Sequence, residues 1–100
     1  MDVKITAVHF TADQKLEAYL QQKLDKLETF YDRIIGAEVF LRLENEGAPV
    51  KDKVVEIKLA VPGQTLFAKD TDRSFEKAAD EAVENLRRQI KKHKEKIQAK

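Results

Sequence analysis

The most concentrated group of chemically active side chains is a run of basic residues at the end of the chain. Between Asn85 and Lys100, seven basic residues accompany a single acid, so this stretch carries a net charge of +6 although the whole chain carries only +1. Charges more than about 8 to 10 Å apart are largely screened at physiological salt, so the acidic remainder does not cancel this local field. Such a field attracts phosphate groups, which makes RNA or DNA the first candidate partner. The basic residues are Arg87, Arg88, Lys91, Lys92, Lys94, Lys96 and Lys100.

The same charge pattern also fits the electrostatics of a helix. Cations in the last turns of a helix oppose its macrodipole, and four acids precede the bases here, at Glu76, Asp80, Glu81 and Glu84. A solvated basic helix end needs no partner, and charge runs are commonly of this type. The charge pattern by itself therefore leaves both interpretations open.

Residues typical of catalysis are sparse. His9 and His93 are the only histidines, there is no cysteine, and neither histidine has a nucleophile or metal-ligand pattern near it. Asp70 and Asp72 flank a predicted turn, where carboxylates accept backbone amides, and the three glycines are too isolated to cradle a phosphate. We therefore expect no enzyme activity, no catalytic residue, no metal site and no cofactor.

Hydrophobic periodicity predicts the elements of the first third of the chain. The alternation of Val3, Ile5 and Ala7 predicts a strand that ends near Phe10. Thr11 followed by Gln14 forms a capping box, which predicts that a helix begins there. One face of this helix is expected to be apolar, because hydrophobic residues recur at spacings of three and four: Leu16, Tyr19, Leu20, Leu24, Leu27, Phe30 and Tyr31.

The middle of the chain predicts three more strands. Gly36 ends the helical region, and alternating apolar residues predict a strand over 37–43 and, after a polar loop at 45–53, a second over 55–61. The Pro-Gly pair at 62–63 predicts a tight turn before a short strand around 66–68.

A second helix is predicted to begin with Asp72 or Ser74 as its N-cap and to run to about Ile97. Its acids and bases lie on the polar side of the helical wheel. The inner face is expected to consist of Phe75, Ala79, Ala82, Leu86, Ile90, His93 and Ile97.

These elements predict an α+β fold with the order β-α-β-β-β-α. A crossover helix makes the first two strands parallel neighbours, and short connections make the others antiparallel, so both helices cover one face of a four-stranded mixed sheet. This arrangement is similar to that of double-stranded RNA-binding domains. Residues 1–100 are expected to form a single domain. Without cysteine or an apolar run of about 20 residues, a cytoplasmic protein free of the membrane is expected.

Two lysines occupy an unusual position on the first predicted helix. Measured from Leu16, the centre of the apolar arc, Lys23 projects only about 20° away and Lys26 about 80°. One interpretation is snorkelling, in which the stem packs on the core edge and the ammonium reaches water. The other is a second row of cations beside the last helix, which would form a phosphate groove together with it.

Three segments carry a resemblance to a known family. They are residues 23–28 (KLDKLE), 31–34 (YDRI) and 86–94 (LRRQIKKHK). Across essentially its whole length the chain resembles the bacterial ribosome hibernation-promoting factor family, in the short form without a C-terminal dimerisation domain. The resemblance implies a protein that occupies the mRNA and tRNA channel of the small ribosomal subunit, contacts its ribosomal RNA and stops translation in stressed or stationary cells.

The resemblance also implies particular RNA contacts. Asn85 and Asp25 depart from the family pattern and make the local field less positive. No DNA partner is implied, and the protein is expected to be monomeric off the ribosome. The alternative from another class is a protein-binding module whose basic helix ends dock on an acidic partner. The implied contacts are Lys23, Lys26, Arg88 and Lys92, with Arg87, Lys91 and Lys94 in the same basic block.

Overall fold

The computed structural model describes residues 1–44 and 52–98. The predicted loop at 45–53 lies outside these residues except for its last two positions, which belong to a strand. The element order β-α-β-β-β-α is confirmed. The elements are β1 (Asp2–Ala7), α1 (Gln14–Phe30), β2 (Gly36–Glu44), β3 (Asp52–Val61), β4 (Gln64–Asp72) and α2 (Phe75–Gln98).

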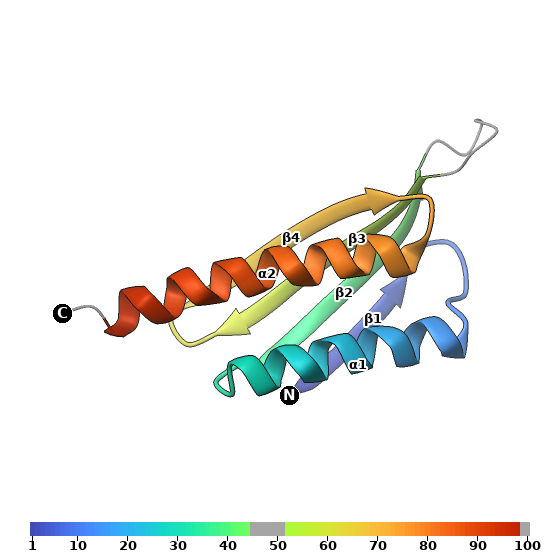
Figure 1. Ribbon diagram of the computed structural model, residues 1–100. Helices are drawn as coiled ribbons and strands as arrows, with labels where there is room; N and C mark the ends of the chain where they lie inside the picture. The colour runs from blue at the N-terminus through green and yellow to red at the C-terminus, as the bar shows by residue number, and fades with distance from the viewer. Residues whose placement is uncertain (45–51, 99–100) are drawn as a thin grey trace.

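The four strands form one mixed sheet in the order β1-β2-β3-β4. β1 runs parallel to β2, while β2 with β3 and β3 with β4 are antiparallel. Both helices lie side by side on the same face of the sheet, and the last turns of α2 project beyond the β3–β4 turn (Figure 1). The predicted fold class is therefore confirmed, and only the last turns of α2 extend past the sheet.

The core lies between the sheet and the two helices. Alternate residues of the central strands, such as Leu41 and Ile57, are fully buried, and so are Leu24 of α1 and Leu86 of α2. Burying a leucine or isoleucine side chain contributes about 1.5–3 kcal/mol, so this core between the sheet and the helices is the main stabilising feature. Every described member of the predicted inner face of α2 is buried; the side chain of Ile97 lies outside the described residues.

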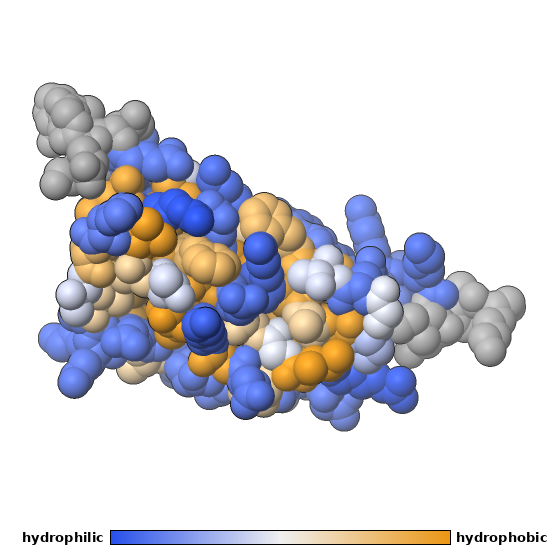
Figure 2. Space-filling model, turned by 180° about the vertical axis from the view of Figure 1, so that it is seen from behind, coloured by the Kyte–Doolittle hydropathy of each residue, from blue (hydrophilic) through white to orange (hydrophobic). Residues whose placement is uncertain are grey.

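The opposite face of the sheet has no helix over it, and Figure 2 shows hydrophobic and hydrophilic side chains exposed there together. Phe67 is 47% exposed on this face. Phe40 lies between two cations, with the Arg42 guanidinium 5.5 Å and the Lys58 ammonium 5.6 Å from the centre of its ring. Arg42 also forms an ion pair with Glu56 on the neighbouring strand. Arg42 and Lys58 thus have partners within the sheet.

The start of α1 differs from the prediction. The N-cap is Asp13, whose Oδ1 accepts a 2.7 Å hydrogen bond from the backbone amide of Leu16, so the capping box at Thr11 is wrong. β1 also ends at Ala7 and not near Phe10. The reason is local, because His9 has a φ of 64° and turns the chain. Phe10 is thereby brought onto Phe75, with 5.4 Å between the ring centres.

The other boundaries are closer to the prediction. β4 is longer than the expected 66–68, because it pairs with β3 along its whole length and backbone hydrogen bonds carry it through polar residues. Gly63 has a φ of 87°, which is the left-handed conformation that a Pro-Gly turn requires at its second position. Ser74 is confirmed as a cap of α2, since its Oγ accepts a 3.0 Å hydrogen bond from the amide of Lys77. Asp72 accepts from the amide of Arg73 instead.

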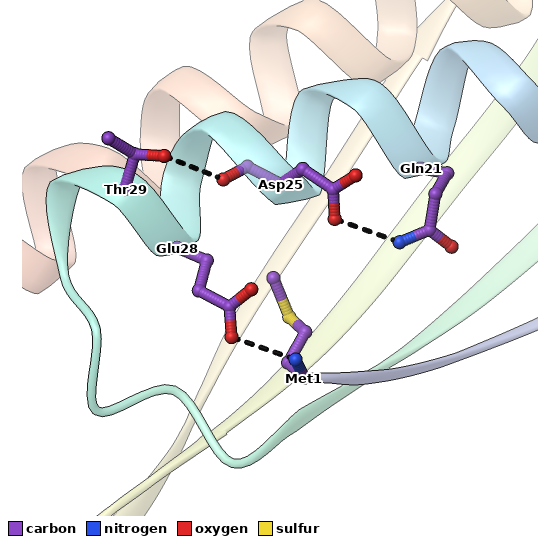
Figure 3. A network of polar contacts seen from close by, with 5 residues as sticks. All are labelled: Met1, Gln21, Asp25, Glu28 and Thr29. Atoms are coloured by element: carbon purple, nitrogen blue, oxygen red, sulfur yellow. Dashed lines mark hydrogen bonds and ion pairs between the residues drawn. The ribbon is translucent and has the colours of Figure 1, made fainter.

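The far end of α1 is tied to the start of β1. The amino group of Met1 lies 2.8 Å from Oε2 of Glu28, as Figure 3 shows. On the outer surface of the same helix, Gln21 donates to Asp25 and the Thr29 hydroxyl donates to the Asp25 carbonyl oxygen. Asp25 therefore makes its contacts within α1. Among the described residues, neither helix is long and apolar enough to span a membrane.

Candidate nucleic-acid interface

A groove of about 360 Å³ lies between α1 and α2. Leu27, Phe30 and Val83 are its apolar residues, so the edge of the hydrophobic core forms part of the groove wall. Cations from both helices also line it, which brings together basic residues that are more than 60 positions apart in the sequence. The charged residues are Lys23, Lys26, Asp80, Glu84 and Arg87.

Lys23 is held in this groove by Asp80. Its Nζ lies 3.0 Å from Asp80 Oδ1 and 5.5 Å from the centre of the Tyr19 ring. The Tyr19 hydroxyl donates a 2.6 Å hydrogen bond to the same carboxylate oxygen. A lysine ammonium has three protons, so Lys23 can donate to Asp80 and still offer protons to a ligand. Snorkelling therefore describes only its stem, because the head group has a specific partner.

The pKa shifts of the three residues follow from this arrangement. Partial burial acts to raise the pKa of Asp80, but the hydrogen bonds from Tyr19 and Lys23 and the charge of Lys23 outweigh burial and lower it. The hydrogen bond to Asp80 raises the pKa of Lys23 and also that of Tyr19. At neutral pH the carboxylate is thus ionised and the ammonium remains charged.

The remaining cations of α2 are distributed around the helix. Arg87 lines the groove, whereas Arg88, one position later and about 100° further round the helix, faces another direction. Arg88 lines a separate hollow together with Asp70, Glu81, Glu84 and Asn85. Lys92 lines a third hollow on the β4 side. Arg88 and Lys92, which the resemblance implies as RNA contacts, thus lie outside the groove that Lys23 and Lys26 line, whereas Arg87 lines it.

The other predicted contacts are solvent-accessible. Lys26, Arg88, Lys91 and Lys92 are exposed, and Lys94 is half-buried beside the end of α1, where its Nζ lies 4.8 Å from the centre of the Phe30 ring. Burial raises the pKa of Asp70, and the charge of Arg88 opposes that rise. The outer side of α2 thus presents cations in several directions.

This combination of fold and basic helices matches a known family. Residues 3–98 match the family described as sigma 54 modulation protein / S30EA ribosomal protein. The chain belongs to this family. It is 32% identical to the ribosome hibernation promoting factor of Pseudomonas putida, across 99% of this chain and 92% of the relative. The family resemblance seen in the sequence is thereby confirmed.

Two solved structures share the fold of this S30EA family member. A ribosomal subunit interface protein from Coxiella burnetii superposes with a TM-score of 0.83 at 20% identity, covering 94% of this chain and 98% of that one. The N-terminal domain of Protein Y from Thermus thermophilus superposes with a TM-score of 0.80 at 24% identity, covering 93% and 99%. The architecture is therefore independent of most side-chain identities.

In this S30EA family member, the residues at the groove that sequence reasoning did not assign to the candidate site are Asp80, Tyr19 and Phe30. From the sequence, Asp80 is one of the early acids that complement the helix macrodipole, and the two aromatic residues belong to the apolar arc. Tyr19 and Phe30 are in fact only half-buried. Their place beside Lys23 at one edge of the apolar arc was the available signal.

His93 makes contacts that hold α2 against the rest of the domain. It is buried at 7% exposure, its Nδ1 lies 2.6 Å from the Gln64 side-chain amide, and its ring meets Tyr31 edge-on at 5.9 Å. The histidine joins the end of α2 to the start of β4 and to the residue after α1. These contacts connect the basic part of α2 to the rest of the domain.

Proposed function

We propose that this protein is a ribosome hibernation factor that binds the small ribosomal subunit in its mRNA and tRNA channel and inhibits translation under stress or in stationary phase. Family membership and the names of relatives support a role on the ribosome. The proposal places the protein in the cytoplasm, as a monomer when it is off the ribosome.

The observation that carries the proposal is the meeting of Lys23, Lys26 and Arg87 in one groove between the helices. Cations contributed by two rigid helices have a fixed spacing. A fixed spacing matches the phosphates of folded RNA better than it matches the acidic side chains of a flexible protein segment. Phosphate contacts position a protein on RNA without encoding base sequence, and structured RNA is recognised largely through its shape.

The distribution of cations around α2 adds to this support. Arg88 and Lys92 face away from the groove, so they would meet different phosphates from those at Lys23 and Lys26. A channel lined by RNA offers phosphates on more than one side. A protein that carries cations on several sides of a projecting helix is suited to such an enclosed site.

The test is equilibrium binding to purified small ribosomal subunits at several salt concentrations. If roughly five cations touch phosphate, log affinity should fall with log salt at a slope near −4, from about 0.7 to 0.9 per contact. Bound mRNA and tRNA should compete with the protein, and protein synthesis in a purified translation system should stop. Purified large subunits are the control and should bind more weakly.

Three outcomes would contradict the proposal in whole or in part. A slope near zero would exclude phosphate contacts as the source of affinity. Failure to bind small subunits, combined with salt-sensitive binding to an acidic protein, would favour the alternative of a protein-binding module. Unchanged binding in the presence of mRNA and tRNA would retain the ribosome as partner but place the protein outside the channel.

A further inference from the structure

The ring of Phe30, the last residue of α1, is contacted by two cations of α2. The guanidinium carbon of Arg87 lies 4.9 Å from the ring centre and Nζ of Lys94 lies 4.8 Å from it. Arg87 and Lys94 are seven residues apart, so they lie on the same side of α2 about two turns from each other. One aromatic side chain thus gathers two cations that would otherwise extend independently into water.

The position of Phe30 at the end of α1 explains why both cations stay there. The C-terminal end of a helix carries partial negative charge, and the last turn of α1 has no basic residue of its own. Lys94 compensates for this, since its Nζ donates to the Phe30 carbonyl oxygen at 3.5 Å. The negative face of the aromatic ring attracts both head groups, which offsets their mutual repulsion.

These two cations differ from Lys23 and Arg42 in having no carboxylate partner among the described residues. Lys23 is paired with Asp80, and Arg42 with Glu56. Within residues 1–44 and 52–96, neither Arg87 nor Lys94 has an acid within ion-pair distance. Their charge is oriented by a ring and a carbonyl group, and it remains available to an anion.

We propose that Phe30 positions Arg87 and Lys94 to bind RNA backbone phosphates at the end of α1, beside the groove that Phe30 and Arg87 also line. This inference rests on the proposed function and assigns part of its binding energy to an aromatic side chain. Arg87 supplies a planar fork that matches phosphate oxygens, and Lys94 supplies a point charge. Holding both in place reduces the entropy that binding would otherwise cost.

The test compares Phe30→Leu, which keeps an apolar side chain at the core edge, with Phe30→Tyr, which keeps the ring. Binding to small ribosomal subunits and to a poly(A)·poly(U) duplex is measured at several salt concentrations. Phe30→Leu should weaken binding to both by roughly three- to tenfold and reduce the salt slope by roughly one unit. Phe30→Tyr should keep the wild-type affinity and the wild-type salt slope.

Phe40→Leu is the matched control. The Phe40 ring also lies between two cations and is half-buried, but it faces away from the helices. This variant should leave affinity and salt slope unchanged. An equal loss in Phe40→Leu and Phe30→Leu would show a general effect of removing an aromatic ring and would overturn the assigned site.

A double variant, Arg87→Gln with Lys94→Gln, covers the case in which Phe30→Leu unfolds. It alters no core residue, and adding Phe30→Leu to it should cause little further loss, because the ring acts through these cations. Wild-type affinity in Phe30→Leu, or full additivity with the double variant, would overturn the inference. If the wild type binds the duplex but not the subunits, the proposed function fails while the duplex arm still tests the phosphate site.

Discussion

The Tyr19 hydroxyl of α1 donates a 2.6 Å hydrogen bond to Oδ1 of Asp80 on α2. The same oxygen lies 3.0 Å from Nζ of Lys23, so one carboxylate joins an aromatic residue and a cation of the neighbouring helix. This contact lies at the groove and sets where the ammonium of Lys23 is held. The stability of the helix pair and the geometry of the cationic groove therefore both depend on Asp80.

Replacing Asp80 with Asn should lower stability in a pH-dependent way. The pKa of Asp80 is lowered in the folded protein, so its stabilising contribution is complete above the unfolded value near 3.9 and is lost as pH falls through the folded value. The carboxylate is 44% exposed and solvent screens the pair, so the loss at pH 7 should be only about 0.5–1 kcal/mol. Urea unfolding at pH 7, 5, 4 and 3 should show the difference from wild type shrinking below pH 4.

Asp25→Asn is the control for that experiment, because Asp25 is an exposed acid on the outer side of α1 that bonds only within its own helix. It should change stability by less than about 0.5 kcal/mol. A deficit in Asp80→Asn that stayed constant down to pH 3 would contradict the ionised contact.

Replacing Lys23 and Lys26 with Gln should weaken binding to small ribosomal subunits. The two lysines contribute the α1 side of the groove, so each lost phosphate contact should reduce the salt slope by roughly one unit. The matched control is Lys4→Gln with Lys69→Gln, which removes the same charge from exposed positions on the far face of the sheet. Equal losses in both double variants would mean that net charge matters and the groove does not.

Replacing Arg88 and Lys92 with Ala should weaken subunit binding without loss of thermal stability. Both side chains are exposed and lie outside the Leu86 face, so the stability change should stay within about 0.5 kcal/mol. Since these residues line hollows apart from the groove, their effect on binding should add to that of Lys23 and Lys26. A collapse of the melting temperature would contradict their assignment to the outer face.

The position of the α1 N-cap can be tested directly. Asp13→Ala removes the acceptor for the Leu16 amide and should destabilise the domain by about 1 kcal/mol, within a range of roughly 0.5 to 2. Thr11→Ala should cost less than about 0.5 kcal/mol, because Thr11 is exposed and precedes the cap. The midpoint of urea unfolding measures both. The reverse order of the two losses would restore the capping box.

The sequence alone determined the elements and the side of each that is buried. Alternation at Val39 and Leu41, and helical spacing from Leu86 to Ile90, predict inward-facing positions because the periods of strand and helix are properties of the local backbone. Crossover and short-connection rules then predicted the mixed sheet. Boundaries were less predictable where a single dihedral angle decided them, as at His9.

The membership of the groove was decided only by tertiary structure. An apolar arc shows which side of α2 faces the sheet, but both of its flanks carry cations, and nothing in the periodicity says which flank lies beside α1. Packing placed Arg87 and Lys94 toward α1, while Arg88 and Lys92 line hollows elsewhere on α2. The contacts of Asp80 with Tyr19 and of Phe30 with Arg87 have the same origin, since they join residues that only the folded helix pair brings within reach.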